Sequence, residues 1–89
     1  MIYTVVWKPS AKQDLAAIWM AASNRNAVTT ASHRIDVLLE TDPDTRGTVL
    51  YDTVRALVVP PLGVEFEVIE DDRTVWVLSV WDASVGPTP

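Results

Sequence analysis

Seven lysine and arginine side chains and one histidine are the groups with which this 89-residue sequence could meet a phosphate. Arg55 stands at the start of an apolar run. It either anchors a phosphate or pairs with a nearby carboxylate such as Asp52 or Glu67. Arginine stays protonated near neutral pH, so Arg55 could neutralise charge but could not accept a proton. The other basic candidates for a binding surface are Lys8, Lys12 and Arg46, and the alternative for the two lysines is solvated charge on a polar face.

Aromatic side chains are the second group that could bind a ligand. Trp81 either stacks on a base or on a partner, a contact worth ~1–3 kcal/mol for a nucleobase, or it closes the core at one end of a sheet. Trp7, Trp19 and Trp76 are predicted core residues by their positions. His33 could serve as a general base, but it is interpreted as a histidine on a helix surface, because no catalytic motif surrounds it.

The acidic residues do not have the spacing of a metal site. The run from Glu65 to Asp72 contains no Asp-x-Asp-x-Asp-Gly pattern and is interpreted as a solvated strand face and loop. A glycine-rich phosphate loop, a nucleophile elbow and a zinc signature are absent from the sequence, which also has no cysteine. We therefore expect neither a metal nor a cofactor.

The composition is that of one small folded domain. Hydrophobic residues make up 48% of the chain, which argues against disorder. Without cysteine the chain has no disulfide, which fits the cytoplasm. No run approaches the ~20 apolar residues of a membrane span, and the first residues do not form a signal peptide. We expect a cytoplasmic protein with no membrane partner.

Charge is unevenly distributed along the chain. The residues up to Arg34 carry a balance of +3, and those from Ile35 onward carry −8, which gives the net charge of −5. Affinity for nucleic-acid phosphates comes mainly from lysine and arginine. An acidic domain of this kind is not a general nucleic-acid binder, and few residues are available to build a local basic face.

Helical spacing begins after Pro9. Ser10 is predicted to be the N-cap, and Gln13 to complete a capping box with it. The apolar face that follows has the spacing i, i+3, i+4, i+7 of a helix and consists of Leu15, Ile18, Trp19 and Ala22. The polar run 23–26 ends this helix.

A second helix follows the polar run, with Asn26 as its predicted cap. Asp42 ends it, because a residue before proline avoids the α region. Two helices joined by a short polar turn form an αα-hairpin. The apolar face of the second helix consists of Ala27, Ala31, Ile35, Leu38 and Leu39.

Strands are predicted on both sides of the hairpin. Residues 3–7 are β-branched and aromatic throughout, as in a strand. After Gly47 the apolar residues alternate with a period of two, which predicts strands over 48–52, 55–59, 64–68 and 74–81, with 70–73 as a hairpin loop. Residues 60–63 are predicted to be a turn or bulge. The last strand is apolar on both faces and is predicted to be central; one face has Val75, Val77 and Trp81, and the other has Trp76, Leu78 and Val80.

The predicted fold class is therefore α+β. An N-terminal strand leads into the αα-hairpin, and a mostly antiparallel sheet of three to four further strands follows. Residues 1–83 are expected to form one domain, and residues 84–89 a C-terminal tail.

The order and punctuation of these elements resemble the RelE/ParE toxin family of bacterial toxin–antitoxin and plasmid-stabilisation systems. The resemblance runs from Tyr3 to about Ala83. It is carried by Tyr-Thr-Val-Val-Trp at 3–7, by Ala, Asp-Leu and Ile within 11–19, by Asp-Pro at 42–43, by Arg55 before its apolar run, and by the closing hairpin over 64–80.

The resemblance implies a toxin neutralised by a cognate antitoxin, with the ribosome and its mRNA or DNA gyrase as the target. Cleaving members of the family carry lysine and arginine on the concave sheet face. Arg55 matches the family's strand arginine and is the candidate catalytic residue. The sequence departs from the pattern elsewhere: Gly63 replaces a base, Phe66 has no hydroxyl, and Trp81-Asp82-Ala83 replaces a segment rich in histidine and arginine.

These departures predict a toxin-like protein that is at best a weak ribosome-dependent mRNA endoribonuclease. The alternative is a degenerate, non-catalytic homologue that acts as a protein-binding module, and a third alternative is an unrelated small structural protein. The sequence does not predict the oligomeric state.

Overall fold

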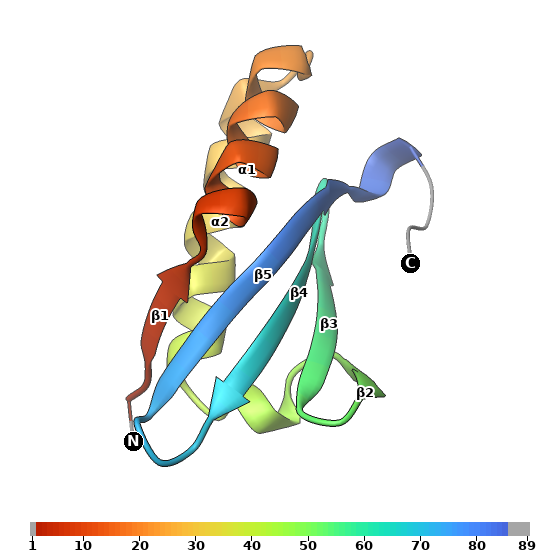
Figure 1. Ribbon diagram of the computed structural model, residues 1–89. Coiled ribbons are helices and arrows are strands. Elements are labelled where there is room, and N and C mark those ends of the chain that lie inside the picture. The colour runs from red at the N-terminus through yellow and green to blue at the C-terminus, as the bar shows by residue number, and fades with distance from the viewer. Residues whose placement is uncertain (1, 86–89) are drawn as a thin grey trace.

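A helical hairpin packs on one face of a five-stranded sheet in the computed structural model, which describes residues 2–85 (Figure 1). The predicted α+β order is confirmed. Most of the predicted tail, residues 86–89, lies outside the described residues, and Ser84 and Val85 belong to a short 3-10 turn. The elements are β1 (Thr4–Trp7), α1 (Pro9–Ala21), α2 (Arg25–Glu40), η1 (Pro43–Thr45), β2 (Thr48–Tyr51), β3 (Val54–Val59), β4 (Leu62–Ile69), β5 (Thr74–Asp82) and η2 (Ala83–Val85).

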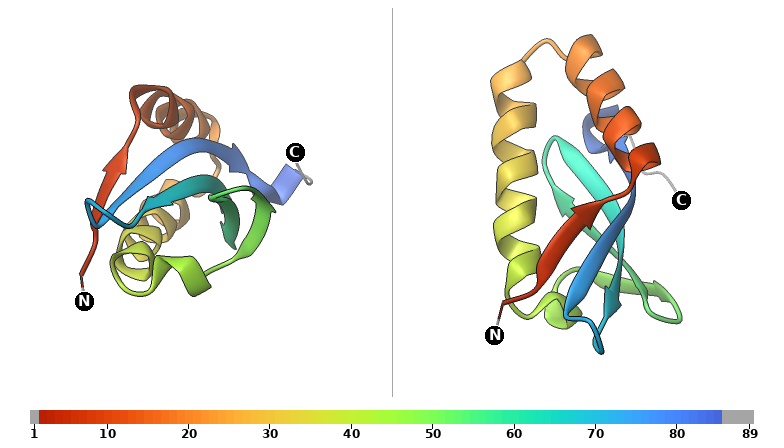
Figure 2. Two further views of the ribbon diagram at one scale, coloured as in Figure 1. Left: turned by 60° about the horizontal axis from the view of Figure 1, so that its bottom comes forward. Right: turned by 60° about the vertical axis from the view of Figure 1, so that its left-hand side comes forward.

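The strands have the order β1-β5-β4-β3-β2, so the first and last strands of the chain are neighbours. β1 runs parallel to β5, and every other pair is antiparallel. The last strand is central, as predicted, because it lies between β1 and β4 (Figure 2). No helix among residues 2–85 is long and apolar enough to cross a membrane.

Both predicted helix caps are wrong. α1 begins at Pro9, one residue before the predicted cap, because the fixed φ of proline suits the first helical position. Ser10 is therefore inside the helix, and its hydroxyl donates to the Leu78 carbonyl oxygen at 3.3 Å. α2 is capped by Asn24 and not by Asn26, since the Asn24 side chain accepts from the Ala27 N–H at 3.0 Å.

The core lies between the helices and the covered face of the sheet. α2 contributes Ile35 and Leu39, which are fully buried against Phe66, Val75 and Val77. Leu15 and Ile18, from the predicted apolar face of α1, pack on this cluster while remaining partly exposed. Leu38 is only half-buried. The switch from helical to alternating spacing therefore located most of the core.

A β-bulge at Leu78 changes the predicted faces of β5. Glu65 pairs with Ser79 while Phe66 pairs with Val77, which leaves Leu78 as the additional residue. The bulge brings Val80 to the covered face with Val77 and moves Trp81 to the opposite face. The predicted placement of Val80 and Trp81 is therefore wrong, because strict alternation does not hold across a bulge.

Two of the three tryptophans predicted to be core residues are not. Trp19 is 40% exposed, and the Arg25 guanidinium lies 4.6 Å from its ring centroid. Trp76 is half-buried on the sheet face that the helices leave open. Trp7 does pack against the core, and its indole Nε1 donates to Asp36 Oδ1 at 2.6 Å.

α1 continues the edge of β5 where β1 ends. The Lys8 N–H donates to the Val77 carbonyl oxygen at 3.0 Å, after which the chain turns into the helix. Further along, the Val80 N–H donates to the Asp14 carboxylate at 3.2 Å. Side chains of a helix thus take the place of a neighbouring strand for this part of β5.

Candidate functional site

One face of the sheet is free of helices. Residues directly opposite each other in a ladder share a face, so the pairing register separates the two faces. The partners of the core residues Phe66 and Val75 lie on the covered face, and the alternate residues lie on the other, which is turned toward the viewer in Figure 1. This helix-free face includes Thr4, Val6, Val54, Ala56, Val58, Gly63, Glu65, Glu67, Ile69, Thr74, Trp76, Ser79 and Trp81.

Carboxylates and tryptophans occupy the middle of the helix-free face. Glu67 lies opposite Trp76, and Glu65 lies opposite Ser79. The Ser79 hydroxyl donates to Glu65 at 2.9 Å, and the Thr53 hydroxyl donates to Glu67 at 2.6 Å. Hydroxyl donors carry no charge, so these bonds orient the two carboxylates without neutralising them. A phosphate would be repelled here, by ~1–4 kcal/mol for each charge at 4 Å.

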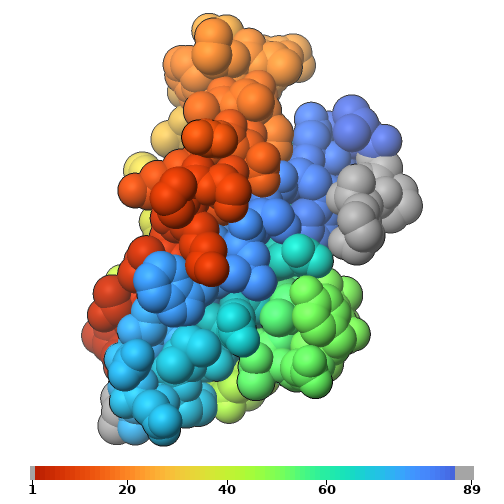
Figure 3. All heavy atoms as spheres, viewed as in Figure 1, coloured from red at the N-terminus to blue at the C-terminus, as the bar shows by residue number. Residues whose placement is uncertain are grey.

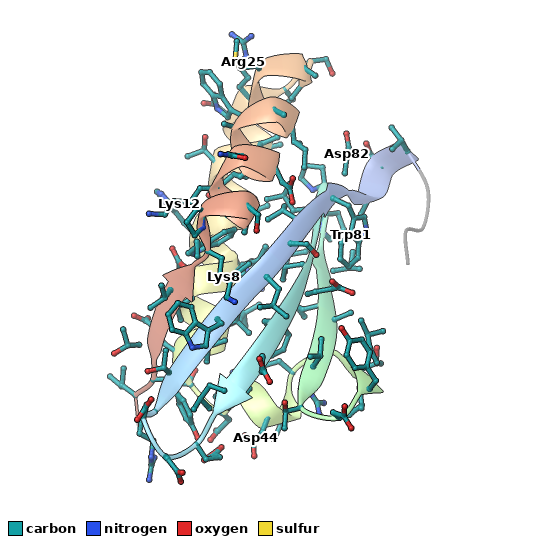
Figure 4. All side chains as sticks on the ribbon, viewed as in Figure 1. Lys8, Lys12, Arg25, Asp44, Trp81 and Asp82 are labelled. Carbon is teal, nitrogen blue, oxygen red and sulfur yellow. The ribbon has the colours of Figure 1, made fainter. Side chains whose placement is uncertain are left out.

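The Trp81 indole packs closely against Gly63, its partner in the ladder. A Cβ atom at Gly63 would come within 2.3 Å of Cε2 in the indole ring, so only glycine permits this contact. The Trp81 side chain stays half-buried on the helix-free face (Figure 4). The sequence left open whether Trp81 stacks on a ligand or closes the core. In the structure it is only partly buried, so one part of the ring packs on the sheet and another part is accessible to solvent.

Lys8 is the basic residue that reaches the helix-free face, from the connection between β1 and α1 (Figure 4). Its ammonium lies 5.6 Å from the ring centroid of Trp76, within the range of a cation–π contact. Lys8 therefore sits beside a tryptophan that has a glutamate as its ladder partner.

Arg55 lies on the covered face, because its partner in the ladder is the core residue Phe66. Its Nε donates to the Arg46 carbonyl oxygen at 2.8 Å, and its Nη2 donates to that of Gly47 at 3.4 Å. Arg46 in turn donates to the carbonyl oxygens of Leu38 and Thr41. These carbonyls lie at the C-terminal end of α2, where they have no partner within the helix. The two arginines together fasten the η1 connection to the sheet.

A polar depression of about 350 Å³ surrounds Arg55 and is lined by Asp44, Asp52 and Glu70. The Tyr3 hydroxyl donates to both Glu70 oxygens at 2.8 Å. This hydrogen bond, with burial and the charge of Glu70, raises the pKa of the Tyr3 phenol above its ordinary 10.0, while Arg73 acts in the opposite direction. Within residues 2–85, no group of three or more histidine, cysteine or acidic side chains could hold a metal ion.

An apolar groove of about 580 Å³ lies between α1 and α2 and is also lined by Trp7 of β1. Lys12 and Asp36 are its charged residues. Among the apolar residues, Met20 is 69% exposed. The apolar lining is Trp7, Leu15, Ala16, Trp19, Met20 and Val28.

β2 is the sheet edge farthest from the hairpin (Figure 2), and all four of its residues are exposed. Val49, Leu50 and Tyr51 are uncharged and keep 58%, 40% and 57% of their surface in solvent. Sheet edges are usually protected by charge, proline or a covering element. β2, which belongs to the green surface at the lower right of Figure 3, contains neither a charged residue nor a proline.

No protein-family model matches the sequence, and none of the curated proteins matches it. Solved structures do match the fold. The toxin–antitoxin complex RelBE2 of Mycobacterium tuberculosis aligns with a TM-score of 0.78 at 16% identity, over 94% of each chain. The chromosomal ParDE system of P. aeruginosa aligns with a TM-score of 0.69 at 18% identity, over 91% of this chain and 96% of the other. This chain has the RelE/ParE toxin fold. A mutant of the E. coli toxin RelE in the free state also matches, with a TM-score of 0.68 at 15% identity, over 96% of this chain and 87% of the other.

The RelE/ParE fold distributes the predicted site residues over three places. Lys8 and Trp81 lie on the helix-free face, Lys12 lies at the groove between the helices, and Arg46 and Arg55 lie together beneath η1. The fold does not bring the four bases together on one surface.

Two features of this RelE/ParE fold were missed in the sequence. The groove between α1 and α2 was missed because Trp19 was assigned to the core. Ala16 and Met20, which lie outside the predicted apolar face of α1, were the available signal for a second apolar surface. The pairing of Glu67 with Trp76 depends on the register of β4 and β5, and a bulge shifts that register. The alternation of acidic and apolar residues over 64–68 was the one available signal.

Proposed function

We propose that this protein is the toxin-like member of a bacterial type II toxin–antitoxin pair, and that it acts by binding its target. The observation that carries the proposal is the RelE/ParE fold, shared over more than nine-tenths of this chain with structures of toxin–antitoxin complexes. The ribosome with its mRNA and DNA gyrase are the two candidate targets.

The chemistry of the helix-free face supports binding over ribonuclease activity. Cleavage of RNA by its 2′-OH requires a proton acceptor, a donor to the leaving oxygen and cations for the developing charge. The described part of this face has Glu65 and Glu67, with Lys8 at its margin. Arg55 is held on the covered face by two backbone carbonyls. Any cleavage is therefore weak, and the alternative is a non-catalytic module that only binds protein.

The apolar surfaces support a cognate antitoxin as the partner. The groove between α1 and α2 suits an amphipathic helix, whose apolar side chains would cover Trp19 and Met20. The β2 edge suits an extended segment that continues the sheet. Either segment would remove from water an apolar surface that the chain cannot cover by itself.

Expression in a bacterial host tests the proposal. Induction of this chain alone should arrest growth, and co-expression of the product of an adjacent short reading frame should restore growth and yield a complex that purifies as one species. If the two proteins elute separately at micromolar concentration, the antitoxin assignment is wrong. If they form a complex but the chain never arrests growth, the non-catalytic protein-binding module is the correct function.

A further inference from the structure

The glutamates and tryptophans of the helix-free face form a regular array along β4 and β5. Glu67 and Trp76 form one ladder pair, Glu65 and Ser79 the next on this face, and Gly63 with Trp81 the third. Residues two apart in a strand are about 6.7 Å apart. Glu65 and Glu67 therefore present two negative charges at the repeat distance of an extended peptide.

The array is fixed in place before any ligand arrives. Ser79 and Thr53 each donate a hydroxyl hydrogen bond to one of the two glutamates. Trp81 is held against the Gly63 backbone, where even a methyl group would collide with its ring. Rigid acceptors bind with a smaller loss of conformational entropy than mobile ones.

One contact within the chain indicates which ligand this array accepts. The Lys8 ammonium lies 5.6 Å from the ring centroid of Trp76, so this tryptophan already accepts a cation. Lys8 reaches the face from its margin and contacts Trp76, so Trp81 and Glu65 stay available to a ligand. The array carries negative charge, whereas a site that binds phosphate carries positive charge.

We propose that the helix-free face binds an extended basic segment of the protein partner, with lysine or arginine at alternate positions. Cations two residues apart would meet Glu65 and Glu67, and the aliphatic parts of these lysine or arginine side chains would lie against Trp76 and Trp81. The proposal rests on the proposed function for the existence of a partner, and it specifies the chemistry of that partner.

The probe is a short synthetic peptide that alternates arginine and threonine, and the comparison ligand is a single-stranded RNA oligonucleotide of similar length. Titration into the full chain, followed by tryptophan fluorescence and by amide and indole NMR shifts, should move Trp76 and Trp81 with the peptide and not with the RNA. The Glu65→Gln/Glu67→Gln variant keeps the size of both side chains and should weaken peptide binding about tenfold.

The matched control is Asp71→Asn/Asp72→Asn, which removes the same charge from the exposed loop between β4 and β5. It should change the affinity less than twofold. Lys8→Ala removes the competing ammonium from Trp76 and should tighten peptide binding about twofold to threefold. Thermal melting identifies any variant that is not folded.

Three results would overturn the proposal: equal weakening in both double variants, since net charge alone would then explain binding; tighter binding of RNA than of peptide; or shifts that avoid Trp76 and Trp81. These measurements need neither the antitoxin nor growth arrest. The toxin role can therefore fail in the expression experiment while peptide binding succeeds, and the reverse outcome is equally visible.

Discussion

Arg55 is the residue whose structural and chemical roles are easiest to separate. Arg55→Ala removes two hydrogen bonds to the backbone of the η1–β2 connection, so we expect the free energy of unfolding to fall by about 1–2 kcal/mol. If the protein acts by binding, as proposed, the variant should leave mRNA cleavage essentially unchanged. Urea denaturation and primer extension on ribosome-bound mRNA measure the two effects.

Arg34→Ala, which removes an exposed base of α2, is the control and should leave stability within about 0.5 kcal/mol. Robust codon-site cleavage by the wild type that disappears in folded Arg55→Ala would show that Arg55 is catalytic. The missing cations would then come from Lys8, Lys12, Arg46 or the ribosome.

Gly63 and Trp81 form a pair that a double-mutant cycle can test. Gly63→Ala places a methyl group where the indole ring now lies, so the ring must move, and we expect a loss of about 1–3 kcal/mol. In the Trp81→Ala background the space is empty, and the same glycine substitution should cost much less. Equal costs in the two backgrounds, measured by urea denaturation, would show that the ring does not depend on the glycine.

Tyr3 gives the protein a stability that depends on alkaline pH. The phenol has a raised pKa because it donates to Glu70, so the folded state binds this proton more tightly than the unfolded state. The contribution is complete below the ordinary pKa of 10.0 and is lost as the pH rises through the higher folded value. Thermal melting from pH 8 upward should show a steeper decline for the wild type than for Tyr3→Phe; parallel curves would contradict this.

Among the elements, β5 depends on α1 for part of its edge. Asp14→Ala removes the acceptor of the Val80 N–H, and we expect a cost of about 1 kcal/mol. Amide exchange at Val80 should accelerate severalfold in native conditions, while Val75, which pairs within the sheet, should change little. Gln13→Ala, on the exposed side of the same helix, is the control, and an unchanged Val80 rate in Asp14→Ala would refute the contact.

The elements themselves were readable from the sequence because each follows a local rule. The period of two predicted strands close to their observed bounds, and the apolar spacing of α2 identified Ile35 and Leu39 as core residues. The bulge at Leu78 was not readable, since it depends on the pairing of β5 with β4. Each cap was misassigned by two residues, because Pro9 suits the first helical position and makes Lys8 the N-cap of α1, and because the Asn24 side chain caps α2 in place of Asn26.

The candidate site was less predictable than the fold. Whether Arg55 faces the helices or the open side depends on its pairing with Phe66, and a sequence does not state a register. The sequence named Lys8 and Trp81 as candidate binding residues, but only the pairing register shows which acidic residues lie near them. Side chains that lie within one element could be identified from the sequence, whereas groups of side chains brought together by strand pairing could not.

For the whole molecule, the groove between the helices gives a test of partner binding that leaves the fold intact. Met20 is 69% exposed, so Met20→Lys should change stability by no more than about 0.5 kcal/mol. A lysine in the apolar groove should weaken antitoxin binding more than tenfold and prevent the antitoxin from restoring growth. Isothermal titration and the growth assay report the two effects.

The control for the groove is Val37→Lys, a change of the same kind at a residue of α2 that is 62% exposed and is not part of the groove lining. It should leave antitoxin binding unchanged. If both lysine variants bind the antitoxin like the wild type, the partner does not use the hairpin, and the β2 edge becomes the surface to test.

The parallel pairing of β1 with β5 determines when during synthesis the sheet can be completed. Thr4 pairs with Thr74, and Tyr3 is hydrogen-bonded to a residue 67 positions later. At roughly 5–20 residues per second, a ribosome needs several seconds to make the intervening chain. Until then β1 has no neighbour, and the core against which Ile35 and Leu39 pack lacks its central strand. A nascent chain of this topology therefore stays incomplete until β5 has been made, and during that interval the apolar faces of α1 and α2 remain open to any protein that the chain meets first.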